Sequence, residues 1–236
     1  MSEEQRLPDM SEKGRREGRE ISLDRRLFMK FTAFKGSASE AARALARSGF
    51  EGAVYRDVND PKGIGTIVLA EDPTVFVTSL RDRFNDGPFG IMAHRPEYDM
   101  LGRTYSIGYE PDLEEVIFNR PRRRILDPDL CWAVWYPLQR SKAFYRLSDE
   151  RQRAILGEHG GIGRRYGEAG LAADVRLACH GLDRNDNDFV IGLLGRRLHP
   201  LSALVREMRA TEQTSQYLDR LGPFFVGHVV WQSPNS

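Results

Sequence analysis

The chain has 236 residues, of which 40% are hydrophobic and 29% charged, a composition typical of a globular protein with one large or two small domains. Its 35 Lys and Arg residues nearly balance its 34 Asp and Glu residues, so no global charge excess favours nucleic acid or an anionic membrane as a partner. No uncharged apolar stretch of about 18 residues occurs, so we expect no membrane-spanning segment, and the N-terminus lacks the apolar centre of a signal peptide.

The N-terminal half begins after a charged segment. Residues 1–22 contain few large apolar side chains and predict a disordered tail. Residues 23–118 then alternate strand and helix patterns, with Ser37 or Ser39 capping the first helix. The patterns predict strands over residues 27–34, 52–55, 65–69 and 98–109, and helices over 40–48 and near 73–84.

A basic segment that contains prolines, residues 119–130, predicts a linker to the second half, residues 131–232. The arginines at 122–124 are interpreted as a solvated or subunit-contacting loop, because no aromatic residues are interleaved to stack on bases. The second half repeats the alternation, so we expect two α+β halves with helices on one face of mostly antiparallel sheets. Its predicted strands cover residues 132–137, 188–194 and 224–231, and its helices 149–166 and 202–217.

The two cysteines, Cys131 and Cys179, lack the spacing of a zinc site and the density of a disulfide scaffold. Both therefore suit a reducing compartment as buried apolar residues, although the sequence leaves a bridge between them open. We expect a cytoplasmic protein.

A histidine interrupts the apolar stripe of the helix that ends at Tyr166. Ile155, His159, Ile162 and Tyr166 lie at offsets 0, 4, 7 and 11 and therefore share one helical face. Three glycines follow His159 within four positions, at a cost of about 1 kcal/mol each relative to Ala. That cost is understandable where a flat group approaches the backbone closely.

A carboxylate occupies the corresponding stripe of the helix predicted over 202–217. Glu212 follows Met208 by four residues, and a carboxylate on a buried stripe needs a partner. Glu212 is therefore predicted to accept a hydrogen bond from one ring nitrogen of His159 and leave the other nitrogen free for a metal. The alternative, a satisfied core histidine, stays open on pattern alone.

Several blocks of the second half together resemble the chlorite dismutase-like family, which includes the bacterial coproheme decarboxylases. The resemblance covers about residues 130–231 in order and spacing, and the first half fits only by pattern. The blocks read WAVWYPLQRS, EHGGIGRRY, HGLDRNDNDFVIG, LVREMRATEQTSQY and GPFFVGHVV.

The resemblance implies an α+β fold with two ferredoxin-like repeats of the dimeric α/β-barrel type, with antiparallel sheets and helices on the outer face. It implies an iron porphyrin, haem b or coproheme, in the second half and assembly into a ring, often a pentamer. His159 falls on the axial iron ligand and Glu212 on the carboxylate that orients it. Arg140, with Arg209 as a weaker candidate, is expected to hold propionates.

Three further positions carry implied roles. Tyr136 falls on the tyrosine that relays an oxidising equivalent during peroxide-driven decarboxylation of coproheme. Phe144 and Tyr145 occupy the positions of the tryptophan pair of true chlorite dismutases.

The residue that acts on peroxide at the opposite face is open between Asp174, on the aligned position, and Arg176, two residues later. Actinobacterial decarboxylases have a histidine near the offset of Asn119, where this chain has none. The absent tryptophans and the unassigned arginine speak against chlorite decomposition.

We therefore predict a haem-dependent oxidoreductase of haem biosynthesis, similar to coproheme decarboxylases, with a porphyrin and hydrogen peroxide as its partners. Two alternatives belong to other classes of protein. One is a haem carrier or sensor without turnover, and the other is a cofactor-free ferredoxin-like oligomer in which His159 and Glu212 form a core pair.

Overall fold

A computed structural model describes residues 7–234. The first half contains four long or medium strands with helices between them, and a short two-residue strand, β6 (Ala93–His94), beside β3. Its elements are β3 (Phe28–Lys35), α1 (Ala38–Ala46), β4 (Glu51–Asp57), β5 (Gly63–Ala70), η1 (Pro73–Phe76), α2 (Ser79–Asn85), α3 (Gly87–Gly90), η2 (Pro96–Tyr98) and β7 (Met100–Arg103).

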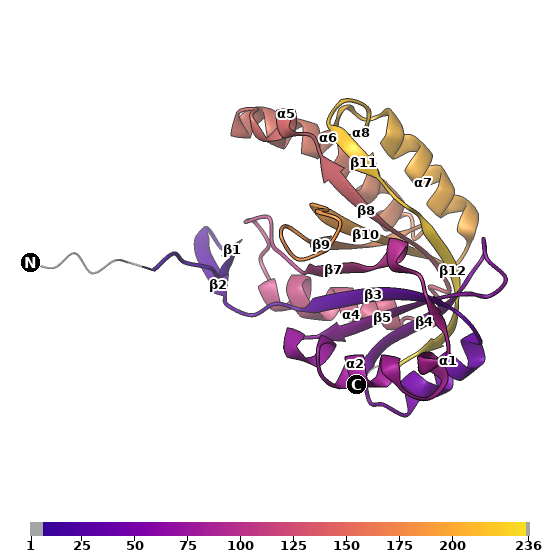
Figure 1. Cartoon of the computed structure of the whole chain (residues 1–236). Coiled ribbons are helices and arrows are strands. Elements are labelled where there is room, and N and C mark those ends of the chain that lie inside the picture. The colour runs from indigo at the N-terminus through magenta and orange to yellow at the C-terminus, as the bar shows by residue number, and fades with distance from the viewer. Residues whose placement is uncertain (1–6, 235–236) are drawn as a thin grey trace, which may run out of the picture.

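The second half repeats this order with a longer first helix (Figure 1). A π-helical turn, η3 (Glu115–Asn119), and the helix α4 (Arg120–Leu126) connect the halves. The elements that follow are β8 (Trp132–Arg140), α5 (Lys142–Tyr145), α6 (Asp149–Glu168), β9 (Ala173–Ala178), β10 (Phe189–Gly195), α7 (Leu198–Ala210), α8 (Glu212–Gln216), β11 (Leu218–Leu221) and β12 (Phe225–Gln232).

The strand order confirms the α+β fold with two ferredoxin-like repeats. In the first half the order is β7-β3-β5-β4, and in the second it is β12-β8-β10-β9, so each half places its fourth strand beside its first. All pairs are antiparallel, and β4 with β12 and β7 with β9 join the halves. The pairings therefore form a closed circuit, with α1, α6 and α7 outside it, whereas η3 and α4 pack against the central cluster (Figure 1).

Alternation along the strands divides the apolar residues between an inner core and two outer layers. In β8, Ala133 and Trp135 belong to the central cluster, whereas Val134 and Tyr136 pack beneath α6 and α7. Successive side chains of a strand point to opposite faces, so one strand supplies both layers. A separate cluster lies under α1 in the first half, where Leu45 is fully buried.

Two predictions for connecting segments were wrong. From residue 12 on, the tail predicted over residues 1–22 forms a hairpin of β1 (Glu12–Arg16) and β2 (Arg19–Leu23), and residues 1–6 lie outside the described part. The hairpin is fixed by Glu12, which accepts hydrogen bonds from Arg26, Arg103 and the amide and hydroxyl of Ser106.

Within the predicted linker 119–130, residues 120–126 form α4. Pro121 lies in its first turn, where a missing amide hydrogen costs nothing, and Ile125 and Leu126 are buried in the central core. Apolar burial thus makes this basic segment a packed helix rather than a loop.

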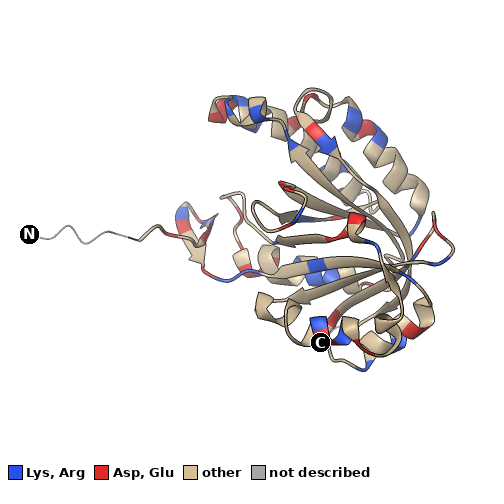
Figure 2. Ribbon diagram, viewed as in Figure 1, with Lys and Arg blue, Asp and Glu red and all other residues tan. Residues whose placement is uncertain are grey.

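No helix within residues 7–234 is long and apolar enough to cross a membrane. Figure 2 shows basic and acidic positions side by side along α6 and α7, as the nearly balanced composition suggests.

We expect Glu12→Ala to lower the free energy of unfolding by about 2 kcal/mol, because two guanidinium groups and the part-buried amide of Ser106 lose Glu12 as an acceptor. Glu20→Ala on the same hairpin is the matched control, since Glu20 is largely exposed and should change stability by less than about 0.5 kcal/mol. Urea denaturation of both variants measures the difference. Equal effects would contradict the anchoring role of Glu12.

Candidate functional site

The candidate site lies on the outer face of β8, β10 and β9. Tyr136 pairs with Ile191, which pairs with Arg176, so these three side chains form one row across the sheet. The neighbouring row on the same face ends at Asp174. Paired residues share a face, so the fold places Tyr136, Asp174 and Arg176 together on the side that α6 and α7 cover.

His159 faces this sheet from α6. Ile155 and Tyr166 of the same stripe are buried, Ile162 packs on the same cluster, and His159 is half-buried between them. The stripe predicted from the sequence is therefore the inner face of the helix.

The hydrogen bonds of Thr211 define the tautomer of His159. Its Nδ1 lies 3.2 Å from Oγ1 of Thr211, a side chain that is 1% exposed. That hydroxyl donates its hydrogen to the carbonyl of Met208 at 2.7 Å, and a carbonyl can only accept. Thr211 must therefore accept from Nδ1–H of His159, which leaves the lone pair of Nε2 free to bind a metal.

Burial and charge keep this imidazole neutral. Burial lowers the pKa of His159 to about 4, and the nearby guanidinium groups of Arg140 and Arg176 act in the same direction. A neutral imidazole is the form that ligates metals, so His159 is ready to bind at neutral pH without first losing a proton.

Glu212 does not accept from His159 as the sequence suggested. The continuous helix predicted over 202–217 ends at Ala210, and Thr211, in extended conformation, caps the separate helix α8. Because of the break, Glu212 does not lie on the buried stripe but pairs with Arg151. Thr211 takes the place beside His159. A threonine followed by an acidic residue is a helix-start signal, and it could have revealed this break.

Arg140, at the end of β8, carries a guanidinium group without an anionic partner among the described residues. Its guanidinium carbon lies 4.8 Å from the ring centre of Phe144 and 4.4 Å from that of Phe189. Its Nε is buried and has no hydrogen-bond partner in the described part of the chain. Stacking between two rings holds the plane of the group and leaves its donors for an anion.

Tyr136 is 8% exposed, and its ring stacks on Phe224 with ring centres 4.5 Å apart. Burial raises the pKa of its phenol, and the neighbouring charge of Asp174 raises it further, so the phenol stays protonated. The packing fixes the ring on the same face as Arg176.

Asp174 is shared between two arginines. Its Oδ1 lies 2.9 Å from Arg124, and its Oδ2 lies 3.0 Å from Nε of Arg176. A cavity of about 320 Å³ opens beside them and is bounded by η3, α4 and the segment after β7. Asp174 therefore lies both on the outer face of β9 and in the wall of this cavity.

Three further residues were predicted to bind the cofactor, and the structure places them differently. Tyr145 is 47% exposed and its hydroxyl donates to Oδ2 of Asp188 at 2.7 Å, so it supports the loop before β10, whereas Phe144 is buried against Arg140. Arg209 is exposed near the end of α7, and within residues 7–234 no hydrogen bond or ion pair joins it to the other candidates. The structure does not bring Arg209 into the cluster.

The glycines around His159 are not required by the packing of the chain itself. A Cβ at Gly157, Gly160 or Gly161 would meet nothing within 4 Å, and one at Gly163 would touch only Met208 at 3.5 Å. Gly157, Gly160 and Gly161 are exposed and lie on other faces of α6 than His159, so the space beside them is solvent. The expectation that these glycines make room for a flat group beside His159 is therefore not supported by their position.

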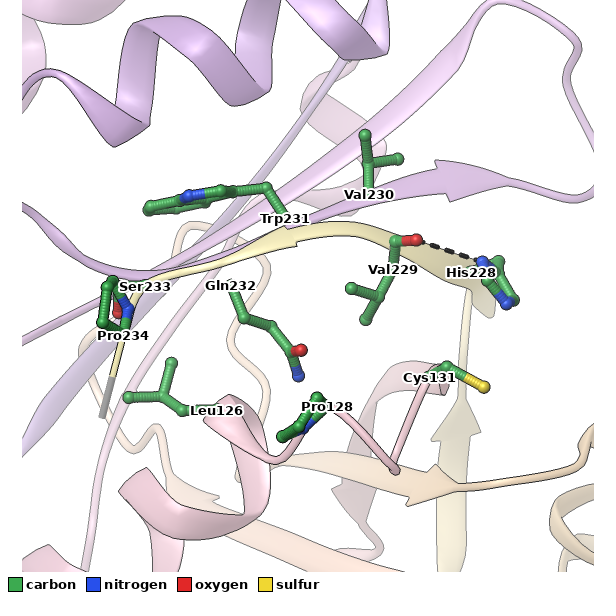
Figure 3. Close-up of a pocket in the computed structure, with 10 residues that line it drawn as sticks. All are labelled: Leu126, Pro128, Cys131, His228, Val229, Val230, Trp231, Gln232, Ser233 and Pro234. Carbon is green, nitrogen blue, oxygen red and sulfur yellow. Dashed lines mark hydrogen bonds between the residues drawn. The ribbon is translucent and has the colours of Figure 1, made fainter.

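The larger cavity of the molecule, of about 580 Å³, lies elsewhere. Figure 3 shows the ten residues that line it, from the end of β12 and the segment after α4, and none of them is a candidate site residue. His228 donates to the carbonyl of Val229 there, and the Cys131 thiol lies near the carbonyl of Arg196. Its lining is mainly aliphatic and aromatic and brings no cluster of ionisable groups together.

The donor set restricts what His159 can bind. Within residues 7–234 no group of three His, Cys, Asp or Glu side chains could hold a metal ion. One neutral imidazole suits a metal that brings its other ligands with it, as an iron porphyrin does. The unpaired guanidinium of Arg140 suits a carboxylate of such a group.

Comparison with known proteins agrees with this geometry. The family model described as chlorite dismutase matches residues 76–230. The chain is 32% identical over 219 residues to a coproheme decarboxylase from Mycolicibacterium smegmatis, covering 85% of this chain and 88% of that protein. It is also 32% identical to a coproheme decarboxylase from Staphylococcus carnosus, over 44% of this chain and 41% of that protein.

Solved structures share the fold at low sequence identity. A haem-binding protein from Thermus thermophilus matches with a TM-score of 0.69 and 17% identity, over 88% of this chain and 92% of that one. A chlorite dismutase variant from Candidatus Nitrospira defluvii matches with a TM-score of 0.68 and 16% identity, over 90% and 93%.

The lowered pKa of His159 predicts a pH-dependent stability. Between about pH 4 and pH 6.5 the unfolded chain binds a proton at this residue that the folded protein does not, so stability falls as pH falls through that window. We expect wild type to lose up to about 1.4 kcal/mol per pH unit more than His159→Gln there. Urea denaturation of both proteins from pH 4.5 to 7.5 measures this, and parallel profiles would contradict the assignment.

Proposed function

The chain belongs to the chlorite dismutase family, and on that premise we propose that it is a haem-dependent oxidoreductase that decarboxylates coproheme with hydrogen peroxide. The observation that carries this proposal is the neutral His159, whose Nδ1 is bound to Thr211 and whose Nε2 is free. The relative that spans most of this chain is a coproheme decarboxylase.

The candidate site residues then have the following roles. Nε2 of His159 would hold the iron of the porphyrin, and the hydroxyl of Thr211 fixes the ring orientation. The guanidinium of Arg140 binds a propionate, because it is unpaired and held flat between Phe144 and Phe189.

Tyr136 and Asp174 serve the oxidation. The Tyr136 phenol, fixed on Phe224, gives up an electron and its proton and regains both from the propionate that is oxidised, and the carboxylate of Asp174 raises its pKa. Arg176 orients peroxide and is itself held by Asp174. We do not extend the proposal to chlorite, since this arginine is ion-paired.

When bound, the porphyrin iron would activate hydrogen peroxide, which is the oxidant. The protein supplies a ligand to the iron, orientation of the porphyrin and charge. The reaction balances for each propionate that is lost. One propionate, one hydrogen peroxide and one proton give one vinyl group, one carbon dioxide and two waters. The propionate loses two electrons, and the peroxide gains them.

The place of the protein in the cell follows as a further part of the proposal. Both cysteines are free thiols, as expected in a reducing compartment, so we place the protein in the cytoplasm and in haem biosynthesis. A ring of identical subunits is the assembly that we expect, and sedimentation analysis tests it.

Purified protein with added coproheme and a few equivalents of peroxide should yield haem b, identified by product mass. Wild type should bind coproheme, and His159→Ala should lose the spectrum of the bound porphyrin, because the axial ligand is gone. Binding without conversion would favour a haem carrier or sensor, and absence of binding would favour a cofactor-free oligomer.

Tyr136→Phe should bind coproheme as wild type does, because the ring and its stacking on Phe224 remain. Its conversion rate should fall at least about a hundredfold, since the phenol proton is missing. Single-turnover measurements after peroxide addition give this rate. An unchanged rate would remove Tyr136 from the mechanism.

Thr211→Val should weaken porphyrin binding by about tenfold, because Nδ1 of His159 loses its acceptor. Glu212→Gln is the matched control on the adjacent residue and should leave the affinity within about twofold, since its partner is Arg151. Titrations followed in the visible spectrum measure both. The opposite result would return the orienting role to Glu212.

A further inference from the structure

The cavity of about 320 Å³ at the edge of the site has a basic lining. Arg120 and Arg124 reach it from α4, and Arg176 reaches it from β9, together with the acids Glu110 and Asp174. Tyr105 also lines it, and its ring centre lies 5.7 Å from that of Phe189, whose ring centre is 4.4 Å from the guanidinium carbon of Arg140. The cavity therefore lies beside the rings that hold Arg140.

Its arginines have few carboxylates to bind. Asp174 serves both Arg124 and Arg176, and Glu115 serves both Arg123 at 2.7 Å and Arg120 at 3.5 Å. Four guanidinium groups thus share two carboxylates, although most such groups in proteins have a partner of their own.

Glu110 does not relieve this excess. Its two carboxylate oxygens accept the backbone amides of residues 107, 108 and 109 at 2.8 to 3.1 Å, which fixes the loop rather than an arginine. Burial lowers the pKa of Arg124, and the charges of Arg120 and Arg176 lower it further, as expected in a region of positive potential. Three arginines and two acids line the cavity, and one of these acids, Glu110, is committed to backbone amides, so the lining suits an anionic ligand.

The rim of the cavity is apolar. Ile107 is 49% exposed and Tyr109 is 64% exposed, although both are large hydrophobic residues. A basic cavity with an apolar rim fits a ligand in which a carboxylate is attached to a flat apolar body. A free inorganic anion would have no use for this rim.

We propose that this cavity binds a propionate of coproheme that haem b lacks, and so distinguishes the four-carboxylate porphyrin from the two-carboxylate one. The inference rests on the proposed function and assigns it a specificity site. Arg120 is the main determinant, because its contact with Glu115 is long and its guanidinium is the least committed of the three. Haem b, the product, has no carboxylate to place in this cavity and therefore binds less tightly than coproheme.

Arg120→Gln should weaken binding of coproheme about tenfold and leave binding of haem b unchanged, as the loss of one charge-assisted hydrogen bond implies. Arg120→Glu should weaken coproheme binding more. Titration of each porphyrin in the absence of peroxide gives the two dissociation constants and their ratio, independently of turnover.

Arg123→Gln is the matched control. Arg123 lies on the same helix, shares Glu115 and is 60% exposed, but it does not line the cavity, so both affinities should remain as in wild type. Equal weakening of the two porphyrins by Arg120→Gln, or no weakening, would overturn the specificity site while coproheme binding by wild type still supported the proposed function. If wild type bound neither porphyrin, both proposals would fall.

Discussion

The alternation of side chains along β8 is the constraint on which both the core and the candidate site depend. Trp135 fills the interior of the strand circuit, and its neighbour Tyr136 stands on the outer face under α6 and α7. The pairing of β8 with β10 and β12 fixes this register, because a slip of one residue would exchange the two faces. The register that places Trp135 in the core therefore also places Tyr136 on the outer face.

Electrostatics then separate the two sides of the site. On the helix side, burial and the charges of Arg140 and Arg176 keep His159 neutral, which a metal ligand requires. On the sheet side, arginines outnumber the carboxylates that hold them. On the proposed function, the same positive charges would keep the lone pair of His159 available and attract the acidic edge of a porphyrin, so the two requirements would not compete.

Local patterns predicted the repeated α+β fold and the inward face of His159, because strand alternation and helix spacing depend on near neighbours in sequence. The strand β9 was missed because its outward residues, Asp174 and Arg176, are charged and hide the apolar alternation of Val175 and Leu177. The N-terminal hairpin depends on Glu12, whose partners Arg103 and Ser106 lie more than ninety residues away. The role of Thr211 depends on where α7 ends, which helical spacing alone does not reveal.

The partner of His159 has a consequence for electron density. A carboxylate acceptor draws the Nδ1 hydrogen toward itself and gives the ring part of the character of an imidazolate, whereas the hydroxyl of Thr211 carries no charge and pulls less. Iron bound to Nε2 would therefore receive less electron density, and its ferric state would be less stabilised. Since a hydroxyl does not titrate in the physiological range, this donor strength would stay constant as the surrounding pH changes.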